Sequence, residues 1–188
     1  MKKLINYLKR FFYFIVFIIV SPIFLLISLF CISFQGWPII YKSERIGKNG
    51  IPFIIYKFRT MREGESEDQT RITKIGSILR RSSLDEIPQL INLINGSMKL
   101  IGARPLPPRC FESKIMKKYF KERHIYSPGL TGLAQVYGKG KVRSAQEKLV
   151  FDIFYIRNKS IYLDLFIFLK TFIVLYRRAV NNKKGLSL

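Results

Sequence analysis

The adjacent acids Asp85 and Glu86 are the residues of this chain best placed to do chemistry, with Arg80 and Arg81 about one helical turn before them. Asp and Glu carboxylates form covalent phosphoryl intermediates, and arginines bind phosphate. A divalent cation would offset the repulsion between a carboxylate and a bound phosphate. The pattern therefore indicates phosphoryl-transfer chemistry with a carboxylate nucleophile.

The sequence holds 12 acidic residues, and the others have simpler explanations. Four lie in the polar stretch of residues 62–70, which predicts a solvated loop. Several stand singly beside Lys or Arg on predicted helices, which is typical of surface ion pairs: Glu112, Glu122, Glu147, Asp152 and Asp164.

The segment around the acid pair also fits a structural role. Ser83 and Glu86 have the spacing of a capping box, and Pro88 suits the first turn of a helix. Acids near a helix start are also favoured by the helix dipole. A cap can position a catalytic group, so the two interpretations are compatible and both stay open.

The charge balance defines the class of partner. The chain has 188 residues, 33 of them Lys or Arg, and a formal net charge of +21, while 48% of residues are hydrophobic, which excludes intrinsic disorder. Such a charge requires a polyanionic partner, namely nucleic acid, an anionic membrane surface or phosphorylated substrates. The single histidine, His124, excludes His-based triads and most zinc sites. Cys31 and Cys110 form no disulfide framework and indicate a reducing compartment.

Residues 11–34 contain no charged residue and are long enough to cross a membrane as a helix. Ser21 and Pro22 lie near the middle of this run, where proline removes a helical hydrogen bond. Basic residues lie on both sides of the run, which draws both ends to the cytoplasmic side. The sequence therefore predicts a re-entrant helix–break–helix over residues 1–34, and a kinked transmembrane helix is the alternative.

Residues 35–188 read as one compact domain without repeats, which makes the chain an α-rich α+β protein with a few short strands. A strand is expected over residues 51–57. The apolar segment 161–176 carries two charges and predicts an amphipathic helix that lies on a membrane, with an ordinary core helix as the alternative. The remaining expectations are helices over residues 73–81, 84–94, 109–125 and 146–157, and loops with a short strand over 128–140.

Five motifs occur in order along the chain. They are Ser21-Pro22 in the apolar run, KFRTM at 57–61, SLDEIPQL at 83–90, GARP at 102–105 and PGLTGLAQV at 128–136. In these motifs the chain resembles the bacterial sugar transferases, the monotopic phosphoglycosyl transferases, over nearly its whole length and at the size of the minimal catalytic domain.

The resemblance implies an enzyme that moves a sugar 1-phosphate from a UDP-sugar to a polyprenol phosphate, usually undecaprenyl phosphate, and releases UMP. It implies that Asp85 is the nucleophile that forms the covalent phosphosugar intermediate, and that Glu86 assists in metal or proton handling. It also implies a requirement for Mg²⁺, with Asp85 as a ligand.

The resemblance further implies that Arg80 contacts phosphate and that Lys57 and Arg104 lie near the active site as phosphate-binding residues. It agrees with a break of the re-entrant helix at Ser21 and Pro22. The expected location is the inner membrane, with the catalytic domain on the cytoplasmic face and its basic residues against anionic lipid.

Two positions depart from the family pattern. Ala103 stands where the family commonly has Pro, and Lys139 stands where Arg often follows Gly; lysine lacks the planar fork of arginine. The rival class is a non-enzymatic, membrane-tethered basic protein that binds nucleic acid or anionic lipid. No helix-turn-helix spacing, zinc pattern or RNA-binding aromatic signature is found, so nucleic acid is not the expected partner.

Overall fold

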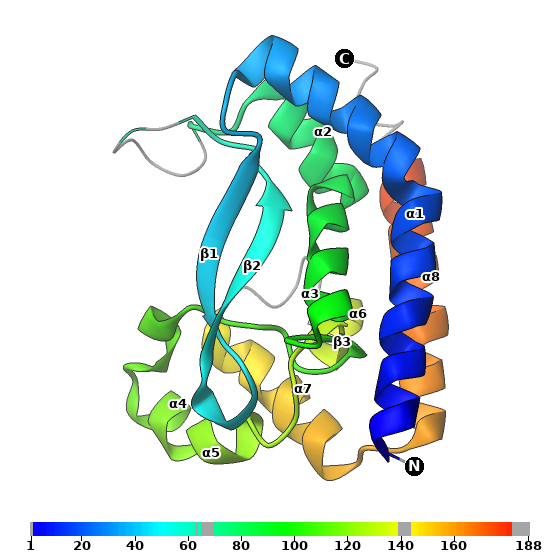
Figure 1. The fold of residues 1–188 in the computed structure, drawn as a ribbon. Coiled ribbons are helices and arrows are strands. Elements are labelled where there is room, and N and C mark those ends of the chain that lie inside the picture. Colours follow the sequence, from blue (N-terminus) through cyan, green and yellow to red (C-terminus); the bar gives the residue numbers. More distant parts are fainter. Residues whose placement is uncertain (1, 63, 65–69, 139–143, 182–188) are drawn as a thin grey trace. The chain divides into compact units, whose positions relative to one another are not determined.

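The structure is a computed structural model that describes residues 2–62, 64, 70–138 and 144–181. It is a mixed helix and strand protein, 64% helical, which confirms the expected α-rich composition. The elements, in chain order, are α1 (Lys2–Gln35), β1 (Ile40–Ile46), the 3₁₀ helix η1 (Lys48–Gly50), β2 (Pro52–Phe58), α2 (Lys74–Ser82), the 3₁₀ helix η2 (Leu84–Gln89), α3 (Leu90–Asn95), β3 (Lys99–Ile101), the 3₁₀ helix η3 (Pro108–Phe111), α4 (Lys114–Lys118), α5 (Phe120–Arg123), β4 (Gly129–Thr131), α6 (Leu133–Gly138), α7 (Ala145–Arg157) and α8 (Ile161–Asn181) (Figure 1).

The chain divides into two compact units. Unit 1 comprises the described residues of 1–42, 56–95 and 178–188, and unit 2 comprises those of 43–55 and 96–177. Strands β1 and β2 pair in a two-stranded sheet and run in opposite directions in Figure 1. The boundaries between the units, after residues 42 and 55, fall within these two strands.

Helix α1 continues through Ser21 and Pro22 as a single helix and bends along its length in Figure 1. Pro22 has no N–H for the carbonyl of Ile18, four residues before it. The Ser21 hydroxyl donates to that same carbonyl at 2.7 Å. The side chain thus replaces the missing backbone donor, which explains why proline bends this helix without ending it.

Most large apolar side chains of α1 are exposed in the structure. Of the described helices, α1 is the one that is long and apolar enough to cross a membrane, and 17% of its most apolar window is buried. Ile27 and Cys31, towards its C-terminal end, pack against Phe58 and Leu79 in the core of unit 1. The rest of its apolar surface remains for another apolar environment, which is compatible with membrane association.

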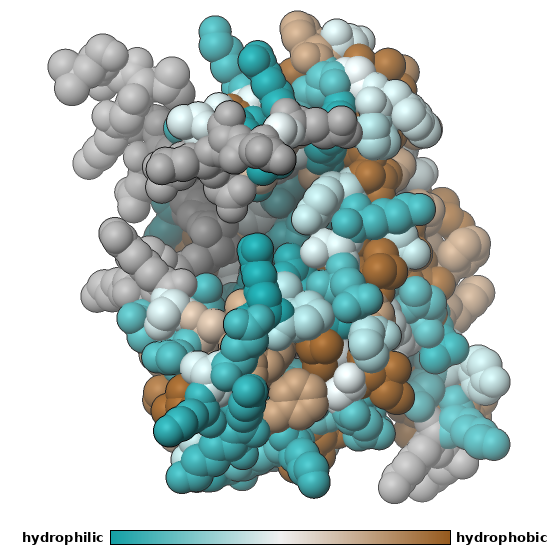
Figure 2. Space-filling model, turned by 90° about the vertical axis from the view of Figure 1, so that its left-hand side faces the viewer, coloured by the Kyte–Doolittle hydropathy of each residue, from teal (hydrophilic) through white to brown (hydrophobic). Residues whose placement is uncertain are grey.

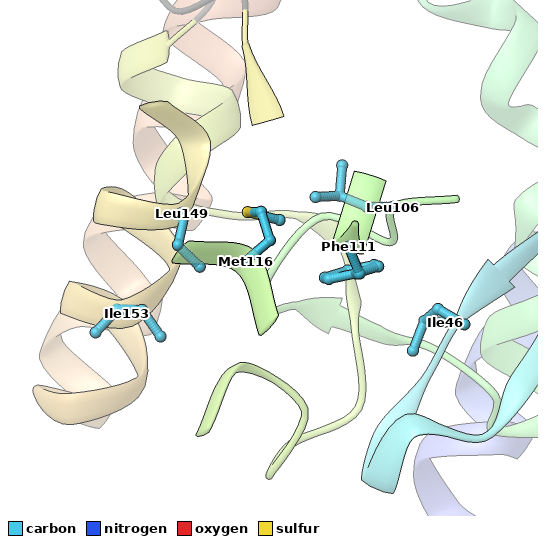
Figure 3. Close-up of a cluster of buried hydrophobic side chains, with 6 residues drawn as sticks. All are labelled: Ile46, Leu106, Phe111, Met116, Leu149 and Ile153. Atoms are coloured by element: carbon cyan, nitrogen blue, oxygen red, sulfur yellow. The ribbon is translucent and has the colours of Figure 1, made fainter. Parts of the chain in front are cut away.

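Unit 2 has its own core, drawn in Figure 3, in which the strand end Ile46, the loop residue Leu106 and the helices η3, α4 and α7 contribute the side chains. Strands β3 and β4 pair in parallel, with Lys99 opposite Gly129. A Cβ atom on Gly129 would lie 2.1 Å from the backbone nitrogen of Gly102, so glycine is required for this close approach. The GARP and PGLTGLAQV motifs therefore lie side by side.

Several expected elements are confirmed, among them the strand β2 and the helices α2, α7 and α8. The helix expected over residues 109–125 is wrong as one element, because it is divided into η3, α4 and α5. The Ser113 side chain accepts from the Met116 N–H and begins α4 as a new helix. Helix α6 was not expected in the Gly-rich segment; it buries Leu133 and Val136 in a second core cluster of unit 2.

The predicted loop of residues 62–70 lies mostly outside the described residues. On the face of the molecule in Figure 2, hydrophilic side chains predominate among the described residues, with hydrophobic ones between them. This surface agrees with the net charge of +21.

Candidate active site

The acid pair of unit 1 meets a lysine from β2. The Lys57 ammonium nitrogen lies 2.8 Å from Glu86 Oε1 and 3.9 Å from Asp85 Oδ2. The side chains of Lys57, Asp85 and Glu86 keep 18%, 11% and 24% of their surface exposed. One ammonium thus serves two carboxylates in a cluster that water still reaches, and the three groups carry a formal net charge of −1.

The backbone before the acids turns sharply at Ser83. Ser83 adopts the left-handed conformation, with φ 61°, and ends α2 where η2 begins. This conformation costs a non-glycine residue about 1–2 kcal/mol. The Glu86 N–H donates to the backbone carbonyl of Ser83 at 3.2 Å, and the Ser83 side chain makes no capping hydrogen bond. The capping-box prediction is therefore wrong, because the main chain, not the hydroxyl, organises this turn.

Arg80 is held by a threonine of the KFRTM motif. Its Nε donates to Thr60 Oγ1 at 2.8 Å, and Thr60 is 6% exposed. Helix α2 approaches this residue closely, because a Cβ atom on Gly76 would lie 2.0 Å from the Thr60 carbonyl oxygen. Sequence reasoning missed Thr60, although its place three residues after Lys57 in the motif was the available signal.

Arg59 connects the same motif to α1. Its guanidinium donates to the carbonyls of Gln35 and Gly36, the latter at 2.8 Å, where the helix ends and its carbonyls lack partners within the helix. The Gln35 side chain also accepts from the Thr73 hydroxyl at 3.0 Å. Residues 57–60 therefore organise unit 1: Lys57 meets the acids, Arg59 holds the end of α1 and Thr60 holds Arg80.

The other predicted site residues lie elsewhere in the chain. Ser21 and Pro22 lie within α1. Arg104 belongs to unit 2, where it follows β3 and its carbonyl accepts from Arg123 at 2.5 Å. The structure thus brings Lys57, Asp85 and Glu86 together and holds Arg80 in the same unit, while Arg104 is described within the other unit.

One predicted surface acid proves to be buried. Asp152 is 1% exposed and pairs with Arg123, which is 2% exposed. The interpretation of Asp152 as a surface pair is therefore wrong, because α7 packs into the core of unit 2 and both members of the pair are buried. The same interpretation is confirmed for Glu122, which pairs with the exposed Arg157.

The donor chemistry of the acid pair fits Mg²⁺. This ion prefers oxygen ligands and is usually held by one or two carboxylates together with substrate phosphates. Asp85 and Glu86 provide two carboxylates, and the described residues contain no group of three or more His, Cys, Asp or Glu side chains. The pair thus suits an ion that takes its remaining ligands from substrate and water.

The model of the bacterial sugar transferase family matches residues 1–178, and the chain therefore belongs to this family. It is 36% identical over 172 residues to the UDP-glucose:undecaprenyl-phosphate glucose-1-phosphate transferase of Klebsiella pneumoniae, an alignment that covers 84% of this chain and 37% of the relative. It is 36% identical over 179 residues to the exopolysaccharide production protein ExoY of Sinorhizobium fredii, covering 82% of this chain and 77% of the relative.

A third relative is the uncharacterized sugar transferase EpsL of Bacillus subtilis, 38% identical over 136 residues, with 69% of this chain and 66% of the relative covered. The matched region thus spans just under two thirds of EpsL and just over a third of the Klebsiella enzyme. The family resemblance inferred from the five motifs is confirmed.

Proposed function

We propose that this chain is a phosphoglycosyl transferase that moves a sugar 1-phosphate from a UDP-sugar to polyprenol phosphate and releases UMP. The observation that carries the proposal is the partly exposed pair Asp85–Glu86, joined by Lys57 and preceded by Arg80. Family membership and the printed names of the relatives, which include UDP-glucose:undecaprenyl-phosphate glucose-1-phosphate transferases, support the substrate classes.

The proposed reaction has two phosphoryl transfers. A carboxylate oxygen of Asp85 attacks the sugar-bearing phosphorus of the UDP-sugar, and the bond to the bridging oxygen breaks as UMP leaves. A phosphate oxygen of polyprenol phosphate then attacks the same phosphorus, and the Asp85 carboxylate leaves. The product is a polyprenyl diphosphate sugar, and Asp85 is regenerated. Lys57 and Arg80 offset negative charge on the phosphates, so positioning and electrostatics supply most of the acceleration.

Mg²⁺ would be held by Asp85 and Glu86 and, when bound, would neutralise charge on the diphosphate. Glu86 is also proposed to hold a proton at its carboxylate, near the phosphate of the departing UMP or of the arriving polyprenol phosphate. Arg104 is proposed as a further residue that binds a substrate phosphate.

The proposed location is the cytoplasmic face of the inner membrane. Helix α1 would enter and leave the membrane from that face, with its bend at Ser21 and Pro22, because basic residues precede and follow its apolar run. Exposed apolar side chains on α8, such as Leu165, Phe172 and Tyr176, support a position of this helix at the lipid–water boundary. The comparisons give no support to the alternative of a non-enzymatic basic protein.

The test is release of UMP by the full chain in vesicles that contain undecaprenyl phosphate, with Mg²⁺ and a panel of UDP-sugars. We expect release with at least one UDP-sugar and a loss of about 10³-fold or more in Asp85→Asn. Glu112→Gln is the matched control, because it removes an exposed acid outside the acid pair. No release with any UDP-sugar, or an active Asp85→Asn, would contradict the proposal.

A further inference from the structure

Arg123 in α5 and Asp152 in α7 form an ion pair in the interior of unit 2. Arg123 Nε and Nη2 lie 3.0 and 2.7 Å from Asp152 Oδ2. The two residues are 2% and 1% exposed. A buried ion pair is weak evidence for a gain in stability, because removing two charges from water offsets much of their attraction. Its presence calls for another explanation.

Both members of the pair also hold the main chain of Arg104. Arg123 Nη2 donates to the Arg104 carbonyl at 2.5 Å. The Arg104 backbone also lies near the Asp152 carboxyl group, where it favours the ionised form. One ion pair thus contacts the main chain of a single residue that lies 19 and 48 positions away in the sequence.

The surroundings leave the pair and its target little freedom. Arg123 lies over the ring of Phe111, with 5.6 Å to the centroid, and its Nη1 approaches the ring nitrogen of His124 at 3.3 Å. The residues before Arg104 are fixed as well, because the Ala103 carbonyl accepts from the Gly129 N–H at 2.9 Å. Pro105 restricts the backbone on the other side.

We propose that Arg123 and Asp152 are positioning residues that fix the main chain of Arg104, so that its guanidinium is presented to a substrate phosphate without a search among backbone conformations. The inference rests on the proposed function, in which Arg104 binds phosphate. Arg123 and Asp152 act through Arg104 and have no contact with substrate themselves. Preorganisation of this kind matters because small displacements of a binding group cost large factors in rate.

If the ion pair only joined α5 to α7, its loss should affect kcat/KM and UDP binding no more than the loss of another link between these helices. The chain offers a matched control for it, because Glu122 and Arg157 join the same two helices through contacts of 2.6 and 3.2 Å. Their side chains are 30% and 60% exposed. Substitution of Glu122 and Arg157 removes a link between α5 and α7 but keeps the contact of Arg123 with the Arg104 main chain.

The experiment measures kcat and KM for the UDP-sugar and, separately, the affinity of the full chain for UDP. The variants are Asp152→Asn, the apolar double variant Arg123→Met with Asp152→Leu, and each of these combined with Arg104→Ala. The apolar double variant guards against misfolding, because well-packed apolar residues often replace a buried ion pair without loss of stability. Glu122→Gln with Arg157→Leu is the control.

We call the Arg123–Asp152 pair the clamp. We expect the clamp variants to lose about 10- to 100-fold in kcat/KM and to bind UDP more weakly. The apolar double variant should keep a melting temperature close to that of the unsubstituted chain. In the Arg104→Ala background the same changes should cause no further loss, because the clamp acts only through Arg104. The control pair should leave both readouts unchanged.

Losses that add to those of Arg104→Ala, or an equal loss in the control pair, would overturn the inference. So would UDP binding that does not depend on Arg104. UDP binding that depends on Arg104 and on the clamp, in a chain that releases no UMP, would refute the proposed function and support the inference.

Discussion

The two charged clusters of this protein are built from the same kinds of groups in opposite settings. In unit 1, the Lys57 ammonium faces the two carboxylates of Asp85 and Glu86, whose side chains keep 11% and 24% of their surface exposed. In unit 2, Arg123 faces the single carboxylate of Asp152, and both side chains are 1% exposed. The first cluster is partly exposed to water, whereas the second is buried in the interior of its unit.

This difference in exposure distinguishes a cluster that can bind a ligand from a cluster that fixes the position of the main chain. Because water reaches the first cluster, its carboxylates can accept a cation, and its lysine contact can be exchanged for a phosphate contact, at modest cost. A buried pair has no such freedom, because any exchange leaves a charge uncompensated in the interior. Carboxylates paired with a basic side chain therefore suit ligand binding in unit 1 and a fixed internal contact in unit 2.

Removing one carboxylate from each cluster sharpens this comparison. Glu86→Gln should lower kcat/KM by about 10²-fold, as for a group that assists proton or metal handling, and change the free energy of unfolding by less than about 1 kcal/mol. Asp152→Asn should lower the free energy of unfolding by about 3 kcal/mol, because Arg123 remains buried without its counter-charge. Enzyme assays and chemical denaturation of both variants give the two readouts.

Equal losses of stability in the two variants would break the distinction between an open and a closed cluster. An unchanged rate in Glu86→Gln would leave that residue a structural role only.

A smaller effect is expected from the histidine beside the buried pair. His124 Nδ1 donates to the Phe120 carbonyl at 2.6 Å, and Nε2 accepts from the Arg123 guanidinium at 3.3 Å, which fixes the neutral ring. Burial, together with the charge of Arg123, lowers the pKa of His124 from 6.5 to about 4. The unfolded chain therefore binds a proton here at a higher pH than the folded chain does.

The sign of the pH effect follows from this. The contribution of His124 is fully present above pH 6.5 and is lost as the pH falls towards 4. The unsubstituted chain should thus lose about 2 kcal/mol more of its free energy of unfolding than His124→Gln over this interval, measured by denaturation at each pH. If the free energy of unfolding fell equally with pH in the unsubstituted chain and in His124→Gln, His124 would not be held neutral.

The sequence alone selects the acid pair as the candidate site, because it has few acids and most of the others have simpler explanations. The contact of Lys57 with both acids was not, since it joins residues 28 and 29 positions apart. The contacts of Thr60 and Arg59 were missed for the same reason: their partners, Arg80 and Gln35, lie on other elements. Spacing along the sequence predicts which residues lie on the same face of one helix. It does not predict which helices and strands pack against one another.

Asp152 shows this limit most clearly. On the sequence it is one acid among basic neighbours, and its burial depends on the place of α7 in the core of unit 2. The bent but continuous α1 is a further case, because Ser21 supplies the hydrogen bond that proline removes from the Ile18 carbonyl. The sequence shows the proline but not the direction of the hydroxyl.

The most direct test of the central claim is to look for the sugar phosphate on Asp85. The full chain is incubated with its UDP-sugar and Mg²⁺ in the absence of polyprenol phosphate, and the peptide that contains residue 85 is examined by mass spectrometry. The account predicts one equivalent of UMP, a sugar-phosphate adduct on Asp85 that later polyprenol phosphate removes, and no adduct in Asp85→Asn. Full turnover with an unmodified Asp85 peptide, and UMP released only when the acceptor is present, would contradict it.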